Sequence, residues 1–196
     1  MNEWLSVIHE WLPVWNVSRA AGSTSYLLLF FSVVAGMSIH YRSFKPGTKA
    51  RMNFIHQAAG WFGMLFGMIH GLVLTFSTYE SFSVVNVLVP FTSSTHPFLI
   101  GLGVLALYSL ILIIVTSDYM NRIGKKAWKT IHFLAFPMFI AALLHGIMLG
   151  PDTREPMILF MYISTASIVA VALIVRIVMH LTKPSTPKTQ KQTVHG

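Results

Sequence analysis

The stretch that decides the fold is residues 53–76, NFIHQAAGWFGMLFGMIHGLVLTF, which contains no charged side chain. An apolar run of this length matches the roughly 20 residues that an α-helix needs to cross the hydrocarbon core of a bilayer. Two histidines, His56 and His70, nevertheless lie inside the run. A polar ring in lipid is costly unless it has a partner, so intramembrane histidines indicate a functional site.

Four more apolar runs accompany this one, at residues 24–40, 98–117, 130–150 and 157–181. The chain of 196 residues is 54% hydrophobic and only 10% charged, which is far from the composition of a soluble domain. The sequence therefore predicts an all-α fold, an integral membrane helical bundle of about five transmembrane helices.

The positive charges, which give a net charge of +8, gather in alternate loops. Residues 41–51, residues 118–129 and the C-terminal tail are rich in Lys and Arg, whereas residues 77–97 and 150–156 are not. Because cytoplasmic loops carry the excess of Lys and Arg, we expect a multi-pass cell-membrane protein with its N-terminus outside and its C-terminus in the cytoplasm. Basic residues that cluster between apolar runs argue against binding to nucleic acid.

The two ends of the chain differ from the apolar middle. Residues 1–23 contain three tryptophans next to a stretch too short to span a bilayer, which predicts an outer interfacial amphipathic segment or, alternatively, a poorly ordered terminus. Residues 182–196 mix proline with Lys, Thr and Gln, which predicts a disordered cytoplasmic tail. Residues 24–181 remain as one transmembrane domain.

The metal chemistry open to the chain is limited by its lack of cysteine. Disulfides, iron–sulfur clusters, thiolate-ligated haem and covalently attached haem are all excluded. Any metal or haem must therefore rest on histidine, methionine or carboxylate ligands.

Four histidines lie deep in predicted spans: His56 and His70 are 14 residues apart, and His132 and His145 are 13 apart. On an ideal helix, His56 and His70 share one face to within about 40° and lie about 21 Å apart along the axis. The second and fourth spans run in the same direction, and His56 and His132 both follow closely on basic loop residues. Matched depth therefore predicts an inner pair, His56 with His132, and an outer pair, His70 with His145.

A pair of imidazoles is the ligand set of a b-type haem, whose iron needs one axial ligand on each side. Structural zinc generally needs four close ligands, whereas pairs separated by about 20 Å of helix rise offer only two each. The sequence thus predicts that residues 24–181 bind two stacked haems b. His56 and His132 would be the axial ligands of the inner iron, and His70 and His145 those of the outer iron.

Three glycines, Gly60, Gly63 and Gly67, fall on the helix face that carries His56 and His70. A glycine stripe between two ligands predicts a shallow trough where a flat macrocycle approaches the backbone. The alternative is a helix-packing seam, since small residues commonly line contacts between membrane helices.

Basic residues near the histidines are candidates to meet the haem propionates. Arg51 and Lys129 would do so at the inner haem and Arg154 at the outer one. The alternative for all three is simple interfacial anchoring.

The fourth span leaves one question open. Thirteen residues of ideal helix turn the face by about 220°, so His132 and His145 are not expected to share a face. Either a kink at Pro137 alters the winding, or the two haems are offset around this helix.

The positions of the remaining histidines indicate less about the function. His40 and His180 lie at cytoplasmic ends and His9 in the outer segment, which favours interfacial positions. His96 begins the third span on the outer side, where it is either a plain loop residue or a contact for an electron acceptor.

The run Gly-Lys-Lys-Ala-Trp-Lys-Thr-Ile-His at residues 124–132, followed by His145, resembles the ferric reductase-like transmembrane domain. That superfamily includes ferric reductases, the NADPH oxidases and the haem-bearing membrane subunit of the bacterial periplasmic methionine sulfoxide reductase system. The resemblance covers about residues 24–180. It implies an oxidoreductase component that carries electrons from a cytoplasmic flavin, through the inner and then the outer haem, to an extracytoplasmic acceptor.

The chain departs from this family in two respects. Members often have six helices, and this sequence predicts five. We also expect no flavin or nicotinamide domain after the last span, because residues 182–196 are too few to bind a dinucleotide. The resemblance therefore implies that the electron donor is a cytoplasmic flavin reductase, a free reduced flavin or a membrane quinol. Ferric chelates, oxygen, an extracytoplasmic oxidoreductase and a secreted flavoprotein all remain open as acceptors.

Three other functions remain open from the sequence. The chain would be a quinol-oxidising cytochrome b subunit, a haem-free carrier whose histidines relay protons or ions, or a structural anchor for a partner enzyme.

Overall fold

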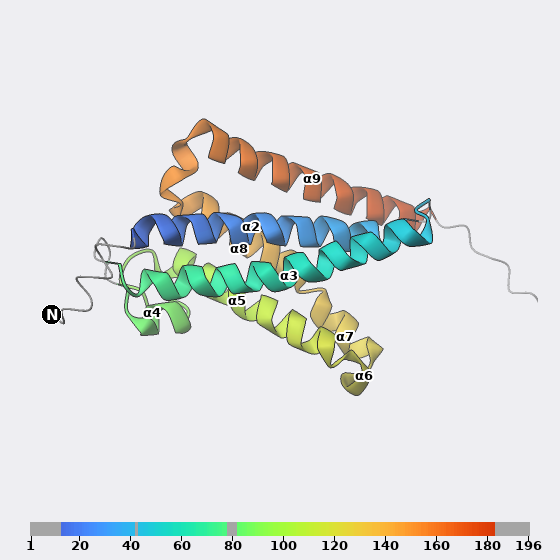
Figure 1. The fold of residues 1–196 in the computed structure, drawn as a ribbon, viewed down its shortest axis with the longest axis horizontal. Coiled ribbons are helices and arrows are strands. Elements are labelled where there is room, and N and C mark those ends of the chain that lie inside the picture. The colour runs from blue at the N-terminus through green and yellow to red at the C-terminus, as the bar shows by residue number, and fades with distance from the viewer. Residues whose placement is uncertain (1–12, 42, 78–81, 183–196) are drawn as a thin grey trace, which may run out of the picture.

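The computed structural model describes residues 13–41, 43–77 and 82–182, and these residues form helices with no strand among them (Figure 1). In chain order the elements are α2 (Val14–Ser38), α3 (Pro46–Leu74), α4 (Val84–Leu88), α5 (Pro97–Asp118), α6 (Met120–Ile123), α7 (Lys125–His132), α8 (Ala135–Leu149), the 3-10 turn η1 (Pro151–Arg154) and α9 (Pro156–Leu181). Five stretches are long and apolar enough to cross a membrane, with α7 and α8 together forming the fourth. The predicted all-α membrane bundle is confirmed.

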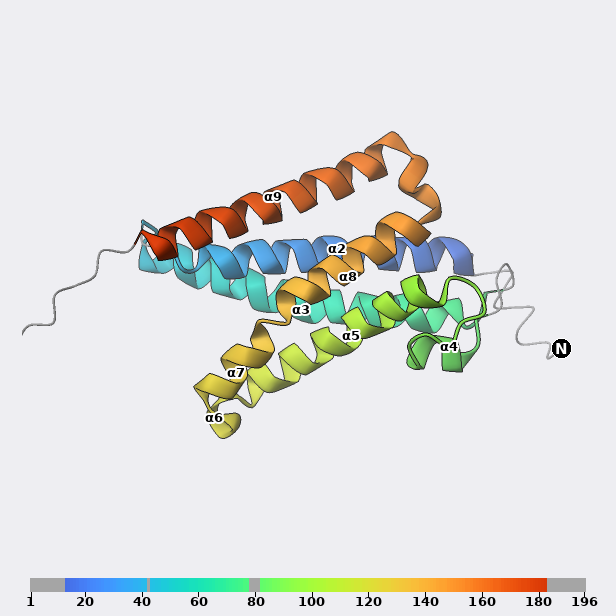
Figure 2. The same cartoon turned by 180° about the vertical axis from the view of Figure 1, so that it is seen from behind.

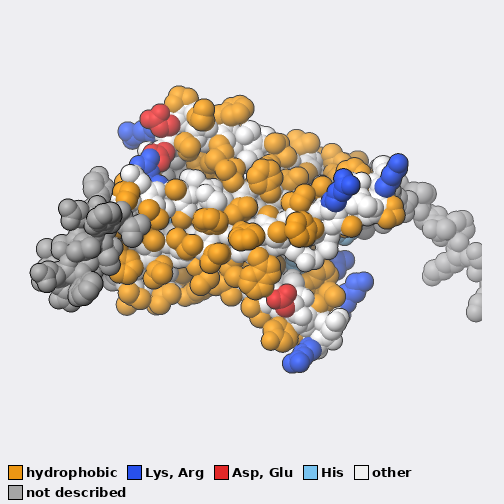
Figure 3. Space-filling view, viewed as in Figure 1, with side chains coloured by type: hydrophobic (Ala, Val, Ile, Leu, Met, Phe, Trp, Pro, Cys, Tyr) orange, Lys and Arg blue, Asp and Glu red, His pale blue; other side chains and the backbone are white. Residues whose placement is uncertain are grey.

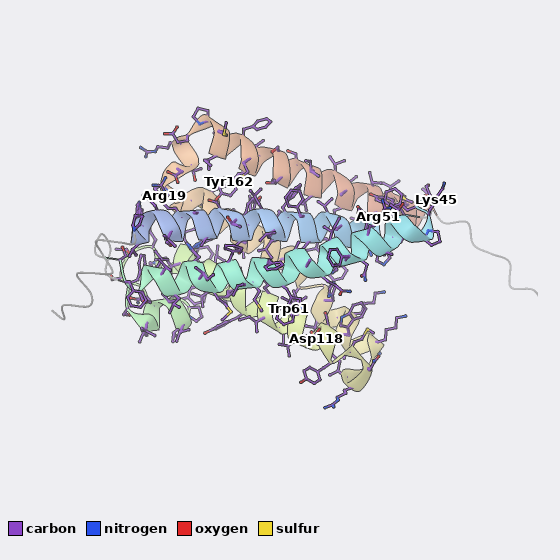
Figure 4. All side chains as sticks on the ribbon, viewed as in Figure 1. Arg19, Lys45, Arg51, Trp61, Asp118 and Tyr162 are labelled. Carbon is purple, nitrogen blue, oxygen red and sulfur yellow. The ribbon has the colours of Figure 1, made fainter. Side chains whose placement is uncertain are left out.

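The helices alternate in direction between two ends of the molecule. We call these the Arg19 end, where α2 begins, and the Arg51 end, where α3 begins (Figure 4). α2 and α3 lie side by side along their whole length, and α9 packs on the other side of α2. Seen from behind, α8 crosses α2 between α9 and α5, while α5 and α7 diverge from α3 toward the Arg51 end (Figure 2).

Proline sets several helix boundaries. α3, α5 and α9 each begin on a proline, a residue favoured at the first helical position because its missing N–H would have no partner there. Pro137 acts differently, inside the fourth span. Its ring excludes the carbonyl of Phe133, four residues earlier, and it cannot donate to that carbonyl. The fourth span is accordingly broken at Phe133 and Leu134, which is the first of the two alternatives that the sequence left open.

The first span begins at Val14, ten residues before the predicted start at residue 24. The helix extends further than the apolar run indicates, because Ser18 and Arg19 lower the apolar content of residues 14–23. In the structure Ser18 and Ser25 are buried and hydrogen-bonded to α3, and Arg19 forms an ion pair with Asp152. The rest of the predicted interfacial segment, residues 1–12, lies outside the described residues, as does the tail after residue 182.

Aromatic side chains join the helices on the α9 side. Tyr26 of α2 stacks on Phe139 of α8 at 5.6 Å between ring centroids, and it contacts Tyr162 of α9 at 4.9 Å. The Tyr26 hydroxyl also lies 2.7 Å from Oγ1 of Thr165. Buried polar groups need such partners in an apolar surround, so this cluster fixes α2, α8 and α9 relative to one another.

The outer surface of the bundle is apolar between two charged ends (Figure 3). Phe54, Phe160 and Leu181 are 71%, 71% and 76% exposed. Exposed apolar surface this extensive is unstable in water and is the normal surface of a protein in lipid. The chain is therefore a multi-pass membrane protein.

A candidate site of two histidine pairs

Two histidine pairs lie between α3 and the fourth span. His56 of α3 faces His132 of α7, with ring centroids 5.8 Å apart and planes at 70°. His70 of α3 faces His145 of α8, with centroids 6.1 Å apart and planes at 83°. These are the two pairs that matched depth predicted. They lie about 21 Å apart along α3, one toward each end of the bundle.

The break in the fourth span explains how both of its histidines reach α3. In one continuous helix, His132 and His145 would point about 140° apart. Because the helix is interrupted at Phe133 and Leu134, α7 and α8 orient their histidines independently. Of the two explanations that the sequence left open, altered winding near Pro137 accounts for the pairing.

Three of the four imidazoles make the same hydrogen bond, from Nδ1 to a main-chain carbonyl of a neighbouring helix. The bonds are 2.9 Å long and join His56 to Ser32, His70 to Ser18 and His145 to Leu99. A carbonyl oxygen only accepts, so Nδ1 carries the proton and Nε2 keeps its lone pair. An imidazole held in this tautomer is a prepared metal ligand, because the partner of the other nitrogen fixes the ring and raises its basicity.

The hydroxyls of the same two serines on α2 also donate hydrogen bonds to the backbone of α3. The Ser32 hydroxyl donates to the main-chain oxygen of His56 at 2.9 Å, and the Ser18 hydroxyl donates to that of His70 at 3.4 Å. Each histidine of α3 is thus tied to α2 through both its ring and its backbone. Sequence reasoning missed both serines.

His132 differs from the other three. Its Nδ1 is buried and has no hydrogen-bond partner among the described residues. The ring instead lies 5.0 Å from that of Trp128, on the preceding turn of α7. A buried polar atom without a partner is uncommon in proteins, and it marks this imidazole as the least constrained of the four.

A cavity of about 260 Å³ adjoins the pair of His70 and His145. Leu29, Val104 and Leu107 give it apolar walls beside the imidazoles. Its polar lining includes the ion pair of Arg19 and Asp152, whose Nε and Oδ2 atoms are 2.6 Å apart, and the exposed loop residues Thr95 and His96.

The three predicted trough glycines all lie against α2, and Gly67, whose added Cβ would meet Ser25 Oγ at 3.2 Å, also lines the cavity. Gly60 and Gly63 are buried against α2, where an added Cβ would meet Ser32 Oγ at 3.5 Å and Leu29 Cδ2 at 3.3 Å. These two glycines lie in a helix-packing seam, the alternative given above. Gly67 lines the cavity beside His70, so a cofactor contact stays a prediction for it.

The predicted propionate partners are exposed cations. Arg51 and Lys129 lie on the surface toward the Arg51 end, and their contact with a haem stays a prediction. Arg154 is exposed and does not line the cavity, whereas Arg19 does. Sequence reasoning missed Arg19 because it lies ahead of the predicted start of the first span.

The donor set fits a metal that brings its own equatorial ligands. Among the described residues, no three His, Asp or Glu side chains gather to hold an ion. With a metal–nitrogen bond of about 2.0 Å, two imidazoles on opposite sides of one ion have centroids about 6.2 Å apart. The measured 5.8 and 6.1 Å match this value. Edge-to-face packing gives similar distances, so the fixed tautomers are the more telling observation.

Comparison with protein families supports this interpretation. Residues 21–143 match the family described as ferric reductase like transmembrane component. The match covers more than half of the chain, so the chain belongs to this family and is a membrane electron-transfer component. The matched region includes His56, His70 and His132 and ends just before His145. Neither the curated proteins nor the solved structures gave a match.

Proposed function

We propose that the protein is a di-haem b-type membrane cytochrome that passes electrons from a cytoplasmic flavin or flavoprotein to an extracytoplasmic acceptor. The observation that carries the proposal is the pair of two-imidazole sites, with three of the four rings fixed in the tautomer that leaves Nε2 free. Membership of the ferric reductase like family supports the same function.

Each pair has a defined part in this proposal. His56 and His132 hold the inner haem, and His70 and His145 hold the outer one. When bound, haem supplies one-electron chemistry through the ferric and ferrous states of its iron. The protein fixes the rings, sets their spacing and surrounds them with apolar side chains.

The orientation follows from charge. Cations converge at the Arg51 end from several helices. His40, just past the end of α2, has its pKa lowered first by partial desolvation and then by the positive charges of Arg176, Lys49 and Lys129. The positive-inside rule puts this end in the cytoplasm. A concentration of positive charge also attracts anionic reductants such as flavin phosphates.

The acceptor side is then the Arg19 end. Arg19, Asp152 and His96 line the cavity beside His70 and His145, so a polar acceptor has side chains to meet there. The family description favours a ferric complex as the acceptor.

The haem-free carrier is less well supported. A proton relay needs imidazoles that exchange protons along a connected path. Three of the four rings donate Nδ1–H to a main-chain carbonyl, which does not pass protons onward.

The test is electron transfer across a sealed membrane. Purified protein in liposomes that enclose a ferric chelate is supplied from outside with reduced flavin and a flavin reductase, or with a menaquinol analogue. Molecules oriented with the Arg51 end outward are expected to reduce the enclosed iron with reduced flavin. Reduction by the quinol alone would favour the quinol-oxidising cytochrome, and reduction by neither would contradict the proposal.

A further inference from the structure

Three imidazoles donate Nδ1–H to a main-chain carbonyl, and we call these the tethered imidazoles. Each of them lies against a glycine of the neighbouring helix. That glycine always comes four residues after the residue whose carbonyl accepts the hydrogen bond. The sets are Ser32 and Gly36 for His56, Ser18 and Gly22 for His70, and Leu99 and Gly103 for His145. An added Cβ at these glycines would lie 3.0, 2.9 and 2.7 Å from the respective Nδ1 atoms. No side chain fits there without displacing the ring.

Helix geometry gives the reason for the spacing. Residues four apart lie one above the other on the same helix face, so a side chain at the fourth position shields the carbonyl below it. Glycine has no side chain, so the carbonyl stays open to the imidazole. The carbonyl has two lone pairs, so it can accept from the imidazole while keeping its own helical hydrogen bond.

His132 is the one ring of the four without this arrangement, since its buried Nδ1 has no partner among the described residues.

We propose that Gly22, Gly36 and Gly103 are positioning residues that open main-chain carbonyls to three of the imidazoles. The inference rests on the proposed function, because it concerns how the ligands are tuned. A tethered imidazole is more basic and favours the ferric state. The outer pair has two tethered rings and the inner pair one, so this factor sets the outer potential below the inner one.

The test replaces each of the three glycines by alanine in the full-length, haem-loaded protein. Gly22→Ala and Gly103→Ala are expected to raise the potential of the outer haem, or to weaken its retention about 10–100-fold, as loss of a ligand's outer partner typically does. Gly36→Ala is expected to do the same at the inner haem alone. A tenfold preference for one oxidation state corresponds to about 59 mV in a one-electron titration. Low-spin EPR signals report which haem has changed.

Gly60→Ala is the matched control, since Gly60 is a buried α3 glycine whose added Cβ would make an ordinary contact of 3.5 Å with Ser32 Oγ and would not meet an imidazole. Both potentials are expected to stay unchanged in it. If the glycine variants shifted both haems equally, or the control shifted them as much, the glycines would act through general packing and the inference would fail. Loss of one haem from a variant counts in favour only if it is the haem named above.

The two possible failures are distinguishable. Wild-type protein that binds no haem would count against the proposed function, whereas unchanged potentials and unchanged haem retention in all three glycine variants would overturn the role of the glycines.

Discussion

The two ends of the bundle carry the same pair of residue types at nearly the same ring separation, yet they are built differently. At the Arg19 end, His70 and His145 are both tied to carbonyls and adjoin a cavity. At the Arg51 end, His56 is hydrogen-bonded in the same way. His132 lies on α7, which the helix break separates from α8, and its Nδ1 has no partner among the described residues. The comparison shows that the spacing of the histidines along the sequence brings the ligands together, whereas the hydrogen bonds to Nδ1 of each ring make the two sites different.

The largest effect is expected from removing an outer ligand. His145→Ala should cut electron delivery to an external acceptor by more than about 100-fold, because losing even a ligand's outer partner costs 10–100-fold. The inner haem should still be reduced from the cytoplasmic side, so stopped-flow spectra should show one haem reduced and no acceptor turnover. Unchanged turnover would place the exit of electrons elsewhere.

Removing the break should affect the other end. Pro137→Ala restores the missing N–H and removes the clash with Phe133, which favours one continuous helix. His132 would then turn away from His56, and we expect selective loss or high-spin conversion of the inner haem in optical and EPR spectra. Pro156→Ala, at the first position of α9, is the control and should leave both haems intact. A change confined to the outer haem would contradict this account of the break.

A smaller effect is expected at the mouth of the outer cavity. Arg19→Ala leaves Asp152 without its partner, so the local charge becomes more negative. The KM for an anionic ferric chelate should rise several-fold, and the rise should shrink at high salt because exposed charges are screened. Arg154→Ala, which alters an exposed arginine outside the cavity lining, should have the weaker effect. Equal effects would mean that only net charge matters.

The smallest effect concerns pH at the Arg51 end. Desolvation and neighbouring cations lower the pKa of His40 below its usual 6.5, so the ring is neutral at pH 7. As the pH falls through this lowered pKa, His40 gains a positive charge, and reduction by an anionic flavin should become modestly faster. His40→Gln should remove that part of the pH profile. A profile that is identical in the variant would exclude His40.

Much of the bundle could be predicted from the sequence, because long apolar runs and loop charges follow directly from the physics of the bilayer. Depth alone also predicted which histidines meet. The start of the first span was missed, since the polar Ser18 and Arg19 find partners that only the tertiary structure reveals.

The contacts behind the histidines were also missed, although the sequence held a signal. A serine followed four residues later by glycine occurs twice in α2, at Ser18 and Ser32, with the same 14-residue separation as His56 and His70. The role of Leu99 had no such signal, because a main-chain carbonyl leaves no trace in residue type.

The most direct test of the central claim is the number of haems per chain in a pyridine haemochrome assay, repeated on His56→Ala, His70→Ala and His96→Ala. We expect about two haems in the wild type and one in each of the first two variants, with different low-spin bands remaining. His96→Ala, which alters an exposed loop histidine, should keep both. Wild-type protein that lacks low-spin b-type absorption, or that keeps both bands without His56 and His70, would contradict the account.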